Sequence, residues 1–105
     1  MSGMHLVQIL LPLLDNDGNP FPHETYREVT RVLTERFGGV TAYTRAPAEG
    51  RWQDDGGREK RDEIVVLENM VDAVDRGWWS EYRRKLETSF RQDEIVLRAS
   101  PIEKL

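Results

Sequence analysis

The sequence predicts a single α+β domain with a ferredoxin-like fold, in which a four-stranded antiparallel sheet carries two helices on one face. Its 105 residues suit one domain with a two-layer core. Two apolar runs, at 6–14 and 64–67, have the near-continuous pattern of central strands, and two longer segments have the apolar periodicity of amphipathic helices. In the order strand-helix-strand-strand-helix-strand, two right-handed crossover units interleave into one sheet.

The first strand is predicted at His5–Leu13, where both faces would be covered. Residues 15–20 are turn formers throughout. Their Asp-Asn-Asp-Gly-Asn order faintly resembles a calcium loop, but the glycine is fourth rather than sixth, and Tyr26 stands where the bidentate glutamate belongs. We interpret this segment as a polar turn and expect no bound metal.

The first helix is predicted at His23–Phe37. It can begin with a capping box formed by Thr25 and Glu28, or with Pro22 in its first turn. Gly38 and the glycine after it can adopt the positive φ that ends many helices. One stripe of the helix carries its apolar side chains, which are Tyr26, Val29, Leu33 and Phe37.

A second strand is expected from Val40, and a third from about 58 to 70, whose apolar part is central in the sheet. The dipeptide Asp55-Gly56 is a strong hairpin signal between them. Because the sheet itself needs fewer residues, we expect 50–61 to form a projecting hairpin arm that takes part in self-association. Trp52 is the only large apolar anchor in this arm.

The second helix is predicted at about 75–92, with Asp72 or Asp75 as its N-cap. The fourth strand follows at Glu94–Ala99. The remaining residues, 100–105, contain a proline and are expected to form a loosely ordered tail of the single domain 1–105.

Composition narrows the classes of function. The formal net charge is -4, and phosphate binding needs an excess of clustered lysine and arginine, so nucleic acid is not an expected partner. The sequence contains no cysteine, which excludes disulfides and thiol chemistry. The apolar run near the start follows no lysine or arginine and is too short to span a bilayer. We therefore expect no membrane association and a cytoplasmic location.

Two helices cover only one face of the predicted sheet. In the first strand, Leu6 and Leu10 point opposite to Val7, Ile9 and Leu11, so both faces are apolar, and the third strand has the same property. A large exposed apolar face usually marks an interface. A homodimer packed sheet against sheet is the economical way to cover it.

Polar strand residues and a tryptophan pair are the candidates for a site. Gln8 interrupts a central strand, and its amide needs a partner in a core, an interface or a pocket on the open sheet face. Trp78 and Trp79 lie about 100° apart on a helix, so one enters the core while the other packs on a loop, a partner or a ligand. The residues expected to line a ligand site or an interface are Gln8, Tyr43, Arg45, Trp52, Glu68 and Trp78.

The sequence indicates no catalytic residue and no cofactor. Gly56-Gly57 belongs to a hairpin rather than to the strand-to-helix turn of a phosphate loop. The two histidines have no carboxylates at a spacing that suggests zinc. The titratable groups available to an enzyme are His5, His23, Tyr43 and Glu68.

Three segments carry a resemblance to a known family. They are Phe-Gly-Gly-Val-Thr at 37–41, Gly-Arg-Trp at 50–52 and the closing run 90–98, Phe-Arg-Gln-Asp-Glu-Ile-Val-Leu-Arg. Together they resemble a family of short bacterial proteins described only as a domain of unknown function, over Leu11 to Ala99. The resemblance implies the same ferredoxin-like fold and no catalytic residues.

Two functions from different classes follow. The first is a dimeric module that binds a small molecule or a partner protein. The alternative is a cofactor-free enzyme of the dimeric α/β-barrel type, which would hold a small organic substrate between the sheet and the helices. A closed pocket with a titratable group distinguishes the enzyme from a module with a dry, filled sheet face.

Overall fold

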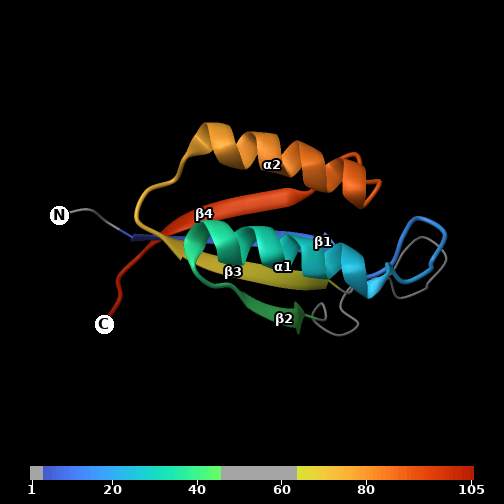
Figure 1. The fold of residues 1–105 in the computed structure, drawn as a ribbon, viewed down its shortest axis with the longest axis horizontal. Coiled ribbons are helices and arrows are strands. Elements are labelled where there is room, and N and C mark those ends of the chain that lie inside the picture. Colours follow the sequence, from blue (N-terminus) through green and yellow to red (C-terminus); the bar gives the residue numbers. More distant parts are fainter. Residues whose placement is uncertain (1–3, 46–63) are drawn as a thin grey trace, which may run out of the picture.

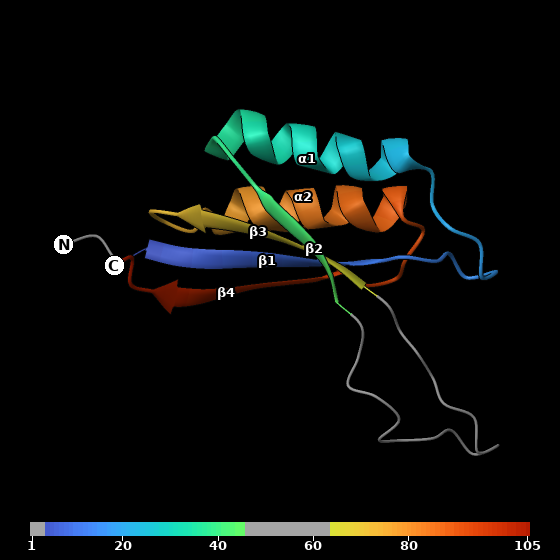
Figure 2. The same ribbon diagram turned by 90° about the horizontal axis from the view of Figure 1, so that it is seen from below.

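The computed structural model describes residues 4–45 and 64–105. Its elements in chain order are β1 (Met4–Pro12), α1 (His23–Phe37), β2 (Thr41–Arg45), β3 (Ile64–Val71), α2 (Arg76–Ser89) and β4 (Val96–Ile102). Within the described residues, four strands form one antiparallel sheet in the order β2-β3-β1-β4. Both helices lie on the same face of this sheet, as the two views in Figures 1 and 2 show. The predicted ferredoxin-like fold is confirmed, with β1 and β3 in the centre.

The core lies between the sheet and the two helices. Because side chains alternate along β1, Val7, Ile9 and Leu11 face the helices, and each is at most 3% exposed. Leu33 of α1 and Leu86 of α2 meet them from the other side and are also fully buried. The buried apolar side chains of this core are Val7, Ile9, Leu11, Phe21, Val29, Leu33, Leu67, Val71, Trp79, Tyr82, Leu86, Phe90 and Ile95, while Val66 is buried on the opposite face of the sheet.

Aromatic contacts fix the helices at both of their ends. Near the start of α1, the rings of Phe21 and Phe90 meet edge to face with centroids 5.0 Å apart. Tyr26 packs on the same Phe90 ring, and its hydroxyl donates a hydrogen bond of 2.6 Å to the carbonyl of Pro12. At the far end, Phe37 of α1 stacks on Trp79 of α2 at 5.2 Å. These contacts set how the helices sit on the sheet.

The bounds of α1 agree with the prediction, and of the two alternatives for its start, the capping box of Thr25 and Glu28 is wrong. Pro22 occupies the N-cap position, and no side chain caps the helix. Glu28 instead pairs with Arg31 on the exposed face, so its carboxylate is not available to the first turn. Gly38 ends the helix with φ 84°, as expected, and its N–H donates to the carbonyl of Thr34 at 2.8 Å.

The second helix begins as predicted and ends earlier. Asp75 is its N-cap and accepts a hydrogen bond of 3.0 Å from the N–H of Trp78. The helix stops at Ser89 rather than at Gln92, because Arg91 takes a positive φ of 51°. The N–H of Gln92 then reaches back to the carbonyl of Glu87 at 2.9 Å, as in a Schellman motif.

The fourth strand was misplaced by the sequence analysis. It spans Val96–Ile102 instead of Glu94–Ala99, so residues 100–102 belong to the sheet and not to a tail. Pro101 is tolerated because β4 is an edge strand, where a missing N–H can face away from the sheet. Smaller shifts of one residue affect β1, which starts at Met4, and β3, which ends at Val71.

The predicted hairpin arm at 50–61, with Trp52, lies outside the described residues. No helix in the described part of the chain is long and apolar enough to cross a membrane.

Candidate functional site

The open face of the sheet carries the side chains that point away from the helices. Along β1 these are Leu6, Gln8 and Leu10, which alternate with the buried core residues. The pairing register places Glu68 of β3 directly opposite Gln8, and Arg98 of β4 opposite Gln8 on its other side. Polar side chains from neighbouring strands therefore meet in one line across the sheet.

A continuous chain of hydrogen bonds joins these side chains. Arg98 Nε donates to Gln8 Oε1 at 2.8 Å, and Gln8 Nε2 donates to Glu68 Oε2 at 2.6 Å. The hydroxyl of Tyr43, on β2, donates to the same Glu68 oxygen at 3.0 Å. We call these four residues, one from each strand, the polar row. Its carboxylate and its guanidinium are both held by the central amide, and their formal charges cancel.

Apolar side chains flank the polar row on both sides. Leu10 lies between Val66 of β3 and Val96 of β4 in the register, and Leu6 lies beside Met70 of β3. Leu6 and Leu10 are half-buried and Val66 is buried. Met70 and Val96 are 51% and 45% exposed, which is high for large apolar residues on a sheet. We call these five residues the apolar flanks.

The structure brings together three of the six residues predicted to line a site. Gln8, Tyr43 and Glu68 are members of the polar row. Arg45 lies in β2 opposite Ile64, and its side chain is not described; Trp52 lies outside the described residues. The expectation that the Gln8 amide finds partners is confirmed, since it both donates and accepts.

The sixth candidate, Trp78, lies on the other side of the sheet. Its ring stacks on Tyr82 at 5.0 Å and meets Phe37 of α1 edge to face at 5.3 Å. The guanidinium carbon of Arg36 lies 4.4 Å from the centre of the Trp78 ring, a cation–π contact. Trp79 is the core member of the pair, as expected for one of the two. Trp78 therefore packs between the helices and does not join the polar row.

Arg98 was missed by the sequence analysis. Alternation along β4 puts Val96, Arg98 and Ser100 on the open face, and the ferredoxin-like strand order pairs β4 with β1. These two facts together place Arg98 beside Gln8, but only once the register is known. A one-residue slip of β4 would turn Arg98 toward the helices.

The four titratable candidates separate into two groups. Glu68 and Tyr43 share the open face, and Glu68 also borders a cavity of about 420 Å³ with Leu6, Thr41 and Met70 among its walls. His5 aligns with the helix-facing side of β1, and its Nδ1 is buried without a hydrogen-bond partner. His23 is exposed at the start of α1. Neither histidine can therefore assist Glu68.

One further buried polar side chain has a structural role. Asn69 of β3 is 3% exposed and donates its amide N–H to the carbonyl of Gly39, which ties the α1–β2 connection to the sheet. Its Oδ1 is buried without a partner. Among the described residues, no group of three or more histidines and carboxylates could hold a metal ion. In the turn after β1, Asp15 Oδ1 accepts from the N–H groups of Asp17 and Asn19, as expected of a polar turn.

Solved structures with the same arrangement of elements are distant in sequence. A phage SAM lyase in complex with S-methyl-5'-thioadenosine superimposes with a TM-score of 0.57 and 14% identity, over 96% of this chain and 83% of that chain. CutA1 from Pyrococcus horikoshii gives a TM-score of 0.52 and 13% identity, over 96% and 85%. A Bacillus cereus protein related to NIF3 gives 0.50 and 15%, over 98% of this chain and 26% of that chain.

No protein-family model matches the chain, and no curated protein has a recognisably similar sequence. The resemblance to a family of short bacterial proteins therefore stays a prediction. At identities this low, the structural likenesses show the fold alone: the chain is a small α+β module of the ferredoxin-like class.

Proposed function

We propose that the protein is a binding module that forms a homodimer through the open face of its sheet. The observation that supports this best is the pairing of apolar flanks with a polar row whose groups already bond to one another. In a monomer the exposed apolar side chains of Met70 and Val96 stay in water. Packing them against a second copy stabilises the dimer by about 25 cal/mol for each Å² of apolar surface removed from water.

The hydrogen bonds within the polar row lower the free-energy cost of removing this face from water. An unpaired carboxylate or guanidinium strongly opposes removal from water. Here Glu68 accepts two hydrogen bonds and Arg98 donates one of its five N–H groups to Gln8, so part of what water would supply is already present within one copy. The row also has no net formal charge. A face of this kind can be covered by another sheet without leaving an isolated charge behind.

The direction of the polar row favours one orientation of the dimer. Arg98 is on the edge strand β4, whereas Glu68 and Tyr43 are on β3 and β2, at the other end of the row. A two-fold axis parallel to the strands brings Arg98 of one copy toward the acidic end of the partner's row. A two-fold axis along the row would instead place Arg98 of one copy opposite the same arginine of the other copy. Charge complementarity supports the first arrangement.

Lysine substitutions on the apolar flanks test this proposal. Met70→Lys and Val96→Lys place a charge in the proposed interface, at positions exposed enough to leave the monomer folded. Both variants should shift the protein to the monomer in size-exclusion chromatography with light scattering. Thr34→Lys adds the same charge on the exposed face of α1 and should leave the dimer unchanged. If the Met70 and Val96 variants dimerise like the wild type, the open face is not the interface.

A second candidate is catalysis on a small organic substrate, and one observation favours it. Glu68 lines the 420 Å³ cavity and accepts a hydrogen bond of 3.0 Å from the Tyr43 hydroxyl, so a carboxylate with a bound proton donor borders a space where a small molecule could bind. A crystal structure of the purified protein separates the two functions. An organic molecule hydrogen-bonded to Glu68 supports catalysis, while a dry face filled by the partner's side chains excludes it.

A further inference from the structure

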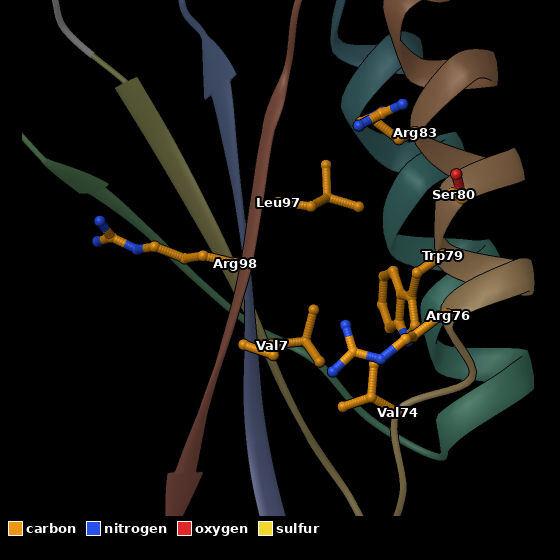
Figure 3. A pocket seen from close by; sticks show the side chains of 9 residues that line it. Val7, Val74, Arg76, Trp79, Ser80, Arg83, Leu97 and Arg98 are labelled. Carbon is orange, nitrogen blue, oxygen red and sulfur yellow. The ribbon is translucent and has the colours of Figure 1, made fainter.

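A second cavity, of about 330 Å³, lies between α2 and the edge strand β4 on the helix-covered side of the sheet. Figure 3 shows Arg76 and Arg83 extending from α2 toward β4, with Leu97 of β4 pointing back at them. Arg98 of β4 is also among the residues next to this cavity. Its side chain, however, points to the opposite side of the sheet, where it joins the polar row. The cavity is therefore separate from the proposed dimer face.

The inner wall of the cavity is apolar. Val7 and Trp79 belong to the core and are nearly fully buried. Val74, in the connection before α2, and Leu97 are half-buried and complete this wall. Trp79 presents an indole ring to the space, as Figure 3 shows. Such a surface binds a flat or branched apolar group by removing it from water.

The outer wall is cationic. Arg76 and Arg83 are seven residues apart, which is almost two helical turns, so they lie on one side of α2, with Ser80 between them. Arg83 Nε is 3.7 Å from Glu87 Oε2, an acceptor that already takes a hydrogen bond from the N–H of Ile95. Within residues 4–45 and 64–105, no hydrogen bond or ion pair involves the guanidinium of Arg76.

We propose that this cavity binds a small organic anion that carries one carboxylate or phosphate group on an apolar body. The anionic group would lie between Arg76 and Arg83, because guanidinium groups donate paired hydrogen bonds to both kinds of anion. The apolar body would lie on Trp79 and Leu97. The volume is at the lower end of the range for small-molecule sites, which suits a metabolite-sized ligand. The positive charge is notable in a chain whose net charge is -4.

Naphthyl phosphate and naphthol test the proposal by isothermal titration calorimetry on the wild-type protein. The two probes share one apolar body and differ in the anionic group. Naphthyl phosphate should bind with a single-site isotherm and should bind at least about tenfold more tightly than naphthol. Naphthoate should bind as well, and its affinity relative to naphthyl phosphate tells whether the site prefers a carboxylate or a phosphate. Inorganic phosphate alone should bind at least about tenfold more weakly than naphthyl phosphate.

Charge-removing variants locate the site. Arg76→Gln and Arg83→Gln should each weaken naphthyl phosphate binding by about tenfold or more. Arg84→Gln is the matched control, since Arg84 is exposed on the same helix and does not line the cavity. Its affinity should equal that of the wild type. Circular dichroism confirms that each variant is folded.

Three results would overturn the proposal. They are equal binding of naphthol and naphthyl phosphate, an equal loss of affinity in the Arg84 variant, and the absence of saturable binding by the wild type. The first and third need no variant, so they hold even if a substitution disturbs α2. None of these outcomes bears on the dimer, because the cavity and the polar row lie on opposite sides of the sheet.

Discussion

Gln8 links the two charged side chains of the polar row on the open face. Its amide has one accepting and one donating end, so it can receive a hydrogen bond from Arg98 and give one to Glu68 at the same time. An apolar residue at this position would fit the pattern of β1 better but would leave both charged neighbours without this link. The polar interruption of a central strand is therefore explained by its neighbours across the sheet.

Replacing Gln8 by leucine tests this role. Gln8→Leu should lower the free energy of unfolding by about 1–3 kcal/mol, because Glu68 and Arg98 each lose a hydrogen bond at a half-covered position. Urea denaturation at one fixed protein concentration measures the change. Ser100→Ala, on the same face of β4, is the control and should change stability by less than about 0.5 kcal/mol. A Gln8→Leu variant as stable as the wild type would show that the row contributes nothing to the fold.

Tyr82 gives the molecule a predictable response to alkaline pH. Burial in the helix–sheet core, with a smaller contribution from the charge of Glu28, raises the pKa of its hydroxyl from the ordinary value of 10.0 to about 12. In the unfolded chain the same group loses its proton near pH 10. Between these values the folded state therefore holds a proton that the unfolded state has released. The stabilisation is complete below about pH 10 and is lost as the pH rises toward 12.

Denaturation across that range checks the effect. The free energy of unfolding should fall between pH 10 and pH 12, and the fall should be shallower in Tyr82→Phe, which has no hydroxyl to titrate. The slope is the quantity to compare, because the substitution also changes stability at neutral pH. Equal slopes in the two proteins would mean that the hydroxyl titrates as freely as in the unfolded chain.

Each helix is held by one apolar stripe that faces the sheet. Leu33 of α1 is 0% exposed and Leu86 of α2 is 2% exposed. Leu33→Ala and Leu86→Ala should each lower the free energy of unfolding by about 2–5 kcal/mol, the lost transfer energy plus the cost of a cavity. Val32→Ala, next to Leu33 but only half-buried, should cost clearly less. A loss below about 1 kcal/mol for either leucine variant would show that this leucine does not face the core, so that the apolar stripe of its helix was assigned to the wrong face.

The sequence predicted elements well where a local signal marks both ends. The first helix has its stripe between a proline and a glycine pair, and its bounds agree with the structure. The second helix has no glycine after it, so the local sequence does not predict the positive φ of Arg91 that ends this helix. The fourth strand continues through Pro101 because pairing with β1 holds it there. This is a tertiary effect that the local pattern does not contain.

Across the whole molecule, the sheet register decides which predicted site residues meet. Gln8, Tyr43 and Glu68 were identified as polar residues on strands, and alternation could place them on one face. Arg98 needed the pairing of β4 with β1, which links residues 90 positions apart. Predicting the α2–β4 cavity requires the distance at which the helix packs beside the edge strand. Neither of these follows from periodicity along the chain.

The two faces of the sheet carry different chemistry. The helix-covered side holds the core and, at its β4 edge, the cationic cavity. The open side holds the neutral polar row between its apolar flanks, which is the surface we assign to self-association. We propose that the open side receives a partner copy and that the helix-covered side binds a small molecule beside α2.

Sedimentation equilibrium of the wild-type protein at micromolar concentration tests the proposed homodimer most directly. Covering the open face with a second copy should give about twice the 12.2 kDa chain mass, and dilution should lower this mass toward that of one chain. The dimer should persist when the salt concentration is raised, since its apolar flanks contribute more than exposed charges. A mass of 12.2 kDa for the folded protein throughout the micromolar range would contradict self-association through the open face.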